Sequence, residues 1–167
     1  MKMNEVSETN TISRPLSLWL ADDDNQIRGL LAELITRSEK IQCSRQFSSA
    51  EAVLDALAGE QPPDLILLDI NMEELSGVEA ILPIKRLASR TRVFIMTTFC
   101  DTVEVARARS AGAAGFFLKR DDWNEAIERM QDQTADWAAE SPVTAPFRAN
   151  PKLAKFSSEL LTPASAS

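Results

Sequence analysis

Four predicted strands each end in a side chain that can do chemistry. These side chains are Asp22 and Asp23, Asp69, Thr97, and Lys119. The carboxyl ends of parallel strands lie side by side at one edge of a sheet, so we expect these groups to meet there. Three carboxylates at one point are unfavourable unless a cation lies among them, and oxygen-only ligation suits Mg²⁺. The pattern therefore predicts a site for Mg²⁺ and a phosphoryl group.

Each of these residues also has an ordinary structural explanation when it is taken alone. A strand-end Asp69 can cap the following turn, Thr97 suits a strand, and Lys119 can extend its ammonium to solvent. Asp24 fits best as the N-cap of the helix that follows it. The functional interpretation rests on the joint occurrence, because every independent structural explanation would have to hold at once.

Apolar runs and helical spacing predict the elements that would position these groups. The expected strands are 16–21, 41–47, 64–69, 92–97 and 115–119, and the expected helices are 25–38, 48–59, 77–88, 102–111 and one that starts near 121–122. In the second helix, Ser48 and Glu51 have the spacing of a capping box. Five alternating strands and helices predict an α/β fold, namely a doubly wound five-stranded parallel sheet.

Composition excludes several classes of function. The chain of 167 residues has no histidine, which removes catalytic triads, most zinc sites and histidine kinases. Its net charge of −7 argues against binding nucleic acid through phosphates. Cys43 and Cys100 are too few for a disulfide framework. No secretory signal or membrane span is visible, so we expect a cytoplasmic protein.

The chain divides into three parts by composition. Residues 1–14 are predicted to be a disordered polar lead, residues 15–137 a globular domain, and residues 138–167 a mobile tail rich in Pro, Ala and Ser. The tail contains Leu161-Thr162-Pro163, and no recognition helix fits in the residues that remain after it.

Residues 16–135 resemble the receiver domain of two-component response regulators, which has a flavodoxin-like (βα)5 fold. The acidic opening Asp22-Asp23 with Arg28, the loop from Asp69 to Gly77, and the separation of Thr97 from Lys119 are similar to the family's motifs. The run 111–119 is similar to the branch that usually carries a LuxR/NarL-type helix-turn-helix output domain.

The resemblance implies a mechanism of phosphorelay signal transduction. Asp69 would accept a phosphoryl group from a sensor histidine kinase or phosphotransfer protein. Asp23, Asp69 and the backbone carbonyl of Asn71 would hold Mg²⁺, and Asp22 would contribute through a water. The roles of the remaining residues, Lys119, Thr97 and Phe116, would be charge neutralisation, a hydroxyl switch and an aromatic switch that moves inward.

The resemblance also implies what the protein does with its phosphoryl group. It would act as a phosphoprotein that signals to a downstream protein, without enzymatic turnover, membrane binding or direct nucleic-acid binding. It would be able to form a phosphorylation-dependent homodimer through the face made by the predicted elements 102–111, 115–119 and the last helix.

Four positions depart from the family pattern. Glu73 and Arg120 stand where the family often has proline, Thr98 is bulkier than the usual residue, and Phe116 lacks a tyrosine hydroxyl. None of these substitutions removes a group needed for phosphoryl transfer.

Two other functions remain open on the sequence. The chain is also explained as a transcriptional response regulator whose DNA-binding domain is absent from it. A Mg²⁺-dependent phosphatase with an aspartate nucleophile is the third reading, since Asp22 and Asp24 have the required spacing, but it leaves the Asp69 loop unexplained.

Overall fold

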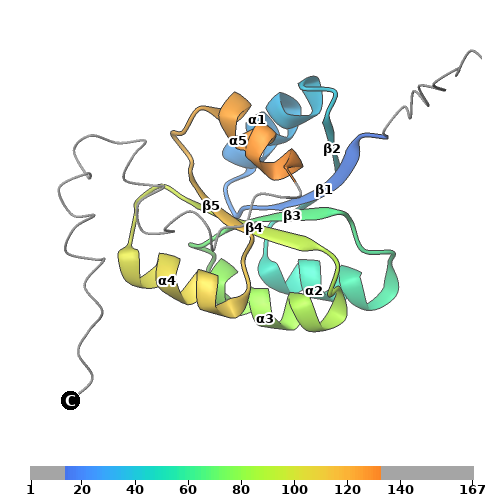
Figure 1. Cartoon of the computed structure of the whole chain (residues 1–167). Coiled ribbons are helices and arrows are strands. Elements are labelled where there is room, and N and C mark those ends of the chain that lie inside the picture. The colour runs from blue at the N-terminus through green and yellow to red at the C-terminus, as the bar shows by residue number, and fades with distance from the viewer. Residues whose placement is uncertain (1–13, 133–167) are drawn as a thin grey trace, which may run out of the picture.

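The computed structural model describes residues 14–132, in which five strands alternate with five helices (Figure 1). Their bounds are β1 (Leu16–Ala21), α1 (Asn25–Arg37), β2 (Ile41–Phe47), α2 (Ala50–Gly59), β3 (Leu65–Asp69), α3 (Gly77–Leu87), β4 (Arg92–Thr97), α4 (Thr102–Ala111), β5 (Gly115–Leu118) and α5 (Trp123–Gln131). The predicted alternation is confirmed. The predicted lead and tail lie outside the described residues, apart from Arg14, so the domain bounds 15–137 remain a prediction.

The strands form one parallel sheet in the order β2-β1-β3-β4-β5. β1 lies one strand in from an edge, β2 forms that edge, and the chain then crosses back over β1 to add β3, β4 and β5 on its other side, so β1 and β3 are neighbours. Ala21, the last residue of β1, lies opposite Leu68, one residue before the end of β3. The predicted doubly wound fold is confirmed, and its switch point lies where the acids follow β1 and β3.

Helices cover both faces of the sheet. In Figure 1, α1 and α5 lie above it and α2, α3 and α4 lie below it. Each layer has its own apolar core. All five residues of β3 are buried, which explains why this strand reads as a continuous apolar run.

Side chains at the helix ends fix where the helices begin. Asp24 caps α1 by accepting hydrogen bonds from the backbone of Gln26 and Ile27, as predicted. The predicted Ser48 cap of α2 is wrong. Ser49 is the N-cap and accepts a hydrogen bond from the Ala52 backbone, because the buried stripe on α2 requires the helix to begin at Ala50.

Asp64, just before β3, ties the start of β3 to the start of β1. Its carboxylate accepts hydrogen bonds from the Ser17 backbone at 2.8 Å and from the Arg14 guanidinium at 2.9 Å. The Ser17 hydroxyl in turn accepts from the Asp64 backbone at 3.1 Å. These bonds hold the first residues of the two strands together at the edge opposite the acids.

No helix among residues 14–132 has the length and apolar character needed to cross a membrane.

Candidate functional site

The first part of the site follows β1. Asp22 is completely buried, and its Oδ1 accepts a hydrogen bond from the Asp24 backbone at 2.9 Å. The Arg28 guanidinium donates to the Asp22 carbonyl at 2.7 Å, which fixes the main chain at this point. Asp23 is exposed. Because Asp24 is engaged as the N-cap of α1, the spacing that suggested an aspartate phosphatase has a structural explanation.

The second part is the end of β3. Asp69 is 3% exposed, and its Oδ1 accepts a hydrogen bond from the Asn71 backbone at 3.2 Å. Gly77 begins α3 directly against this turn. A Cβ atom at Gly77 would lie 2.3 Å from the Asp69 carbonyl oxygen, so only glycine lets the helix start here.

Lys119 joins the two acidic strand ends. It follows β5, and its Nζ lies 2.7 Å from Asp22 Oδ2 and 3.0 Å from Asp69 Oδ2. The Lys119 side chain is 13% exposed, so this ammonium neutralises the carboxylates where water screens little charge. Lys119 is positioned by its backbone, which donates to the Thr97 carbonyl at 2.8 Å.

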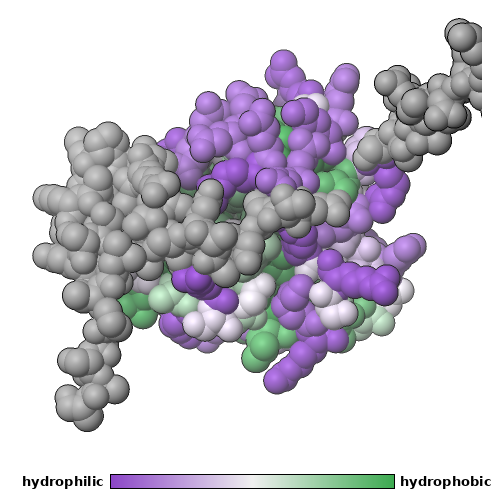
Figure 2. Space-filling view, viewed as in Figure 1, coloured by the Kyte–Doolittle hydropathy of each residue, from purple (hydrophilic) through white to green (hydrophobic). Residues whose placement is uncertain are grey.

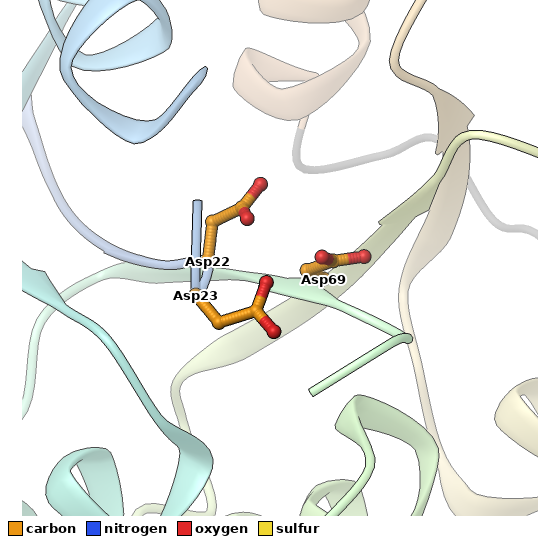
Figure 3. A group of neighbouring side chains, drawn as sticks. All are labelled: Asp22, Asp23 and Asp69. Carbon is orange, nitrogen blue, oxygen red and sulfur yellow. The ribbon is translucent and has the colours of Figure 1, made fainter. Parts of the chain in front are cut away.

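Three carboxylates converge on one point. Figure 3 shows the Asp22 and Asp23 side chains from the end of β1 beside Asp69 from the end of β3. One oxygen from each lies within 4.8 Å of the others. Hard carboxylate oxygens at this spacing fit Mg²⁺, which keeps several waters and takes few protein ligands. The donor set therefore suits the cation that the sequence predicts.

The electrostatics of the site reflect burial and crowding. Burial raises the pKa of Asp69 to about 6; Lys119 opposes this shift and the negative charge of Asp22 adds to it. Burial by itself lowers the pKa of Lys119, but hydrogen bonds to Asp22 and Asp69 outweigh it and raise that pKa above its ordinary value. Lys119 is therefore fully charged, whereas burial disfavours the ionised form of the Asp69 carboxylate.

The two predicted switch residues are buried beside the site. Thr97 ends β4 with 2% of its surface exposed, and its hydroxyl accepts a hydrogen bond from the Asn71 side-chain amide at 3.3 Å. Phe116 on β5 is 4% exposed and belongs to the core between the sheet and the α2–α4 layer. The ring therefore already occupies an inward position in this structure.

The structure brings together the predicted residues Asp22, Asp23, Asp69 and Lys119. Thr97 is connected to them through Asn71, whose backbone bonds to Asp69 and whose side chain bonds to Thr97. Sequence reasoning missed the Asn71 side chain, because it assigned this residue a role only through its backbone carbonyl. It also missed the capping box of Ser76 and Glu79, which fixes α3 behind the loop and whose spacing is visible in the sequence.

Comparisons with known proteins agree with this geometry. The family model of the response regulator receiver domain matches residues 18–131. The chain is 36% identical over 105 residues to the response regulator protein VraR of Staphylococcus aureus (strain Mu3 / ATCC 700698), which covers 62% of this chain and 49% of VraR. It is 37% identical over 115 residues to the DNA-binding transcriptional regulator NtrC of Proteus hauseri, which covers 69% of this chain and 24% of NtrC.

Solved structures show the same fold. The signal receiver domain of the putative response regulator NarL from Mycobacterium tuberculosis matches with a TM-score of 0.66 at 23% identity, covering 71% of this chain and 95% of that one. A response regulator from Burkholderia pseudomallei matches with a TM-score of 0.66 at 21% identity, covering 78% of this chain and 75% of that one.

The fold, the family match and the strand-end acids define one class of protein: the chain belongs to the response regulator receiver domain family of two-component systems. Receivers of this family are in general signalling domains that act through a phosphorylation switch. The chain spans about half the length of the VraR relatives that it matches.

Proposed function

We propose that this chain is a phosphoacceptor receiver in which Asp69 takes a phosphoryl group from a histidine kinase or a phosphotransfer protein. The observation that carries the proposal is the position of Lys119, whose Nζ lies within 3.0 Å of both Asp22 and Asp69. A mostly buried lysine side chain (13% exposed) held between two strand-end carboxylates supplies fixed positive charge where a phosphoryl group would arrive.

The chain's own residues account for the chemistry of transfer. An oxygen of Asp69 forms the new bond to phosphorus while the phosphorus–nitrogen bond of the donor phosphohistidine breaks, and the electron pair of that bond stays on the imidazole. The Lys119 ammonium neutralises oxygens of the phosphoryl group during transfer. The Asn71 backbone, which donates to Asp69 Oδ1, keeps the carboxylate oriented.

Asp22, Asp23 and Asp69, with the Asn71 carbonyl, are the proposed holders of Mg²⁺. The bound cation supplies neutralisation of phosphoryl and carboxylate charge. The proposal is supported by the three converging carboxylates and by the printed description of the Burkholderia pseudomallei relative, which has a phosphorylated aspartic acid and a calcium ion.

Thr97 and Phe116 are the proposed switch residues. After transfer the Thr97 hydroxyl would exchange its bond from Asn71 for one to the phosphoryl group, and Phe116 would hold the inward position against the α4 side. The output is a change in the surface around α4, β5 and α5, which acts on a downstream protein or on a second copy of the chain. We propose that the domain has no enzymatic turnover and does not contact nucleic acid or membranes. We also propose a cytoplasmic setting, in which Cys43 and Cys100 stay reduced.

Intact-mass spectrometry after treatment with acetyl phosphate and Mg²⁺ tests the proposal. We expect the mass of one added phosphoryl group on the wild-type chain and none on Asp69→Ala. The exposed Asp55→Ala variant on α2 is the matched control and should label like wild type. Because the Asp69 side chain is only 4% exposed, this experiment also tests whether a donor reaches it. Label that persists in Asp69→Ala assigns the acceptor elsewhere.

The metal assignment has a separate test. Asp23→Ala removes the exposed carboxylate of the three and should weaken Mg²⁺ binding, followed by titration of the fluorescence of Trp19, which lies on β1 close to the acids. Unchanged Mg²⁺ affinity would remove Asp23 from the proposed ligands.

A second candidate function is favoured by the length comparison. The VraR relatives are about twice as long as the matched region, and the NtrC relative is named as DNA-binding. The chain would then be the receiver part of a transcriptional regulator whose DNA-binding domain it lacks. The mass of the native gene product decides: a value well above 18.4 kDa favours this candidate.

A further inference from the structure

Lys119 lies in a turn that follows β5. The Asp121 backbone donates a hydrogen bond to the Leu118 carbonyl at 2.9 Å, and the Asp121 carboxylate accepts one from the Leu118 backbone at 2.8 Å. Lys119 is therefore the first of the two central residues of a four-residue turn. Because the lysine side chain is flexible, the position of its ammonium depends on how firmly this turn holds the main chain.

Both polar groups of the Lys119 main chain have hydrogen-bond partners. Its N–H donates to the Thr97 carbonyl of β4 at 2.8 Å. Its carbonyl accepts a hydrogen bond from the indole N–H of Trp123, the first residue of α5, at 3.1 Å. Without the indole donor, the peptide that follows Lys119 could rotate, and such a rotation would change the direction of the lysine side chain.

Packing fixes the ring of Trp123. It is 8% exposed and belongs to the core between the sheet and the α1–α5 layer. Its ring centroid lies 6.2 Å from that of Phe117 on β5. The other buried residues of α5 are Ala126, Ile127 and Met130. Figure 2 shows mainly hydrophilic side chains on the visible outer side of this layer, so the apolar contacts of α5 are turned inward. A ring packed in this way holds its N–H in one direction.

The residue after Lys119 adds no restraint of its own. A proline at this position would restrict the backbone of both residues. Arg120 imposes no such restriction, and it is exposed. The main chain of Lys119 therefore depends on its hydrogen bonds, and Trp123 supplies the one that holds the carbonyl.

We propose that Trp123 is a positioning residue for phosphoryl transfer: its indole N–H fixes the main chain of Lys119 and so keeps the ammonium between Asp22 and Asp69. This inference rests on the proposed function of Asp69 as the phosphoacceptor. Trp123 acts through Lys119 alone. Its loss should therefore impair the step that needs the ammonium and spare the binding of Mg²⁺, for which the carboxylates are the proposed ligands.

The test compares phosphoryl uptake with Mg²⁺ binding in the full chain. Trp123→Phe keeps an aromatic ring beside Phe117 and removes the N–H donor. With acetyl phosphate and Mg²⁺, we expect uptake followed by intact mass to be about fivefold slower, the effect of one hydrogen bond. Mg²⁺ affinity measured by calorimetry should not fall, because the carboxylates lose a competing cation. A general loosening of the fold would weaken both.

The matched control is Trp19→Phe. Trp19 is 3% exposed and lies in the core on the other face of the sheet, so this variant makes the same change of ring size away from Lys119. It should take up phosphoryl like wild type. A second variant carries benzothienylalanine at position 123, which keeps a bicyclic ring and has sulfur in place of the N–H. It should be as slow as Trp123→Phe.

Two results of these measurements would overturn the proposal. They are uptake at the wild-type rate in the benzothienylalanine variant, and a loss of Mg²⁺ affinity that parallels the loss of uptake. A crystal structure of Trp123→Phe decides the positioning even if the wild-type chain takes up no phosphoryl group, a result that would reject the proposed function. We expect Lys119 Nζ to leave at least one of the two carboxylates, and an ammonium that stays within 3.0 Å of both would also overturn the proposal.

Discussion

Lys119 compensates the negative charge of the two buried carboxylates of the site, Asp22 and Asp69. Without its ammonium, Asp22 and Asp69 would be buried carboxylates facing each other across adjacent strands, with only backbone donors to stabilise them. With it, each acid has a cation within 3.0 Å. The same charge that makes the acids tolerable in the folded protein is the charge that a phosphoryl group would meet.

Asn71 is expected to restrain the hydroxyl of Thr97. Asn71→Ala removes the side-chain donor at 3.3 Å and leaves the backbone bond to Asp69 intact. Because one partly exposed hydrogen bond contributes about 0.5–1 kcal/mol, we expect roughly a two- to fivefold larger phosphorylated-to-unphosphorylated ratio at steady state with acetyl phosphate. Phos-tag electrophoresis measures that ratio.

The control for this restraint is a double-mutant cycle. In a Thr97→Ala background, Asn71→Ala should have no further effect, because the hydroxyl that it restrains is gone. Asn124→Ala on α5 removes an exposed amide away from the site and should behave like wild type. An effect of Asn71→Ala that survives loss of the hydroxyl would mean that the amide acts on Asp69 by another route.

At the scale of elements, the start of α3 depends on close approach to β3. Gly77→Ala would place a Cβ 2.3 Å from the Asp69 carbonyl oxygen, which is backbone and cannot rotate away. We expect a loss of about 1–3 kcal/mol in the free energy of unfolding and slower phosphoryl uptake, because the loop that holds Asp69 must shift. Urea unfolding and the labelling experiment measure the two effects.

Gly29 in α1 provides the matched comparison. A Cβ there meets nothing within 4 Å, and the residue lies inside a helix. Gly29→Ala should therefore stabilise the protein by about 0.5–1 kcal/mol and leave phosphoryl uptake unchanged. Equal behaviour of the two alanine variants would show that the backbone at Gly77 relaxes freely.

Asp64 makes the pairing of β1 and β3 dependent on pH. Burial alone raises the pKa of Asp64, but hydrogen bonds and charge from Arg14 and Ser17 outweigh it and hold the folded-state pKa below the ordinary value of 3.8. A depressed pKa contributes stability that is present above the unfolded value and is lost as the pH falls through the folded value. The wild-type chain should therefore be more stable than Asp64→Asn near neutral pH, and the difference should shrink in acid.

Urea unfolding at about pH 7 and about pH 3 measures this difference. Asp55→Asn removes the same charge from an exposed position on α2 and should follow the wild-type curve at both values. If the difference in free energy of unfolding between wild type and Asp64→Asn is the same at both pH values, the charge of Asp64 does not contribute to stability.

For the whole molecule, the fold could be predicted from the sequence because the strands and helices that each segment favours locally are the ones that the complete sheet requires. Continuous apolar runs marked strands covered on both faces, and β3 is completely buried as such a run requires. The same placement of strands brought Asp22, Asp69 and Lys119 together, although their functional roles remain proposals. The cap of α2 was missed by one residue, since Ser48 and Ser49 both suit an N-cap and only packing of Ala50 chooses between them.

Contacts between side chains distant in sequence could not be predicted in the same way. The Asn71 amide reaches Thr97 across 26 positions, and the Asp64 carboxylate reaches Ser17 across 47. Neither pair has a spacing that any local rule recognises. The pocket lined by residues of α3 and α4 is likewise a property of two packed helices, which the pattern of either helix alone does not predict.

We propose that residues 14–137 form the complete receiver unit, which extends the domain predicted at 15–137 by Arg14. Both apolar cores described here are built from residues between Leu16 and Met130. A fragment of 14–137 should unfold cooperatively within about 2 °C of the full chain and take up phosphoryl at the same rate. A fragment that begins at Leu18, where the family match starts, lacks Arg14 and Ser17 and should unfold at lower temperature, because Asp64 loses its partners. Equal melting of the two fragments would show that the family boundary is sufficient, and melting of both far below the full chain would place part of the fold in residues outside 14–137.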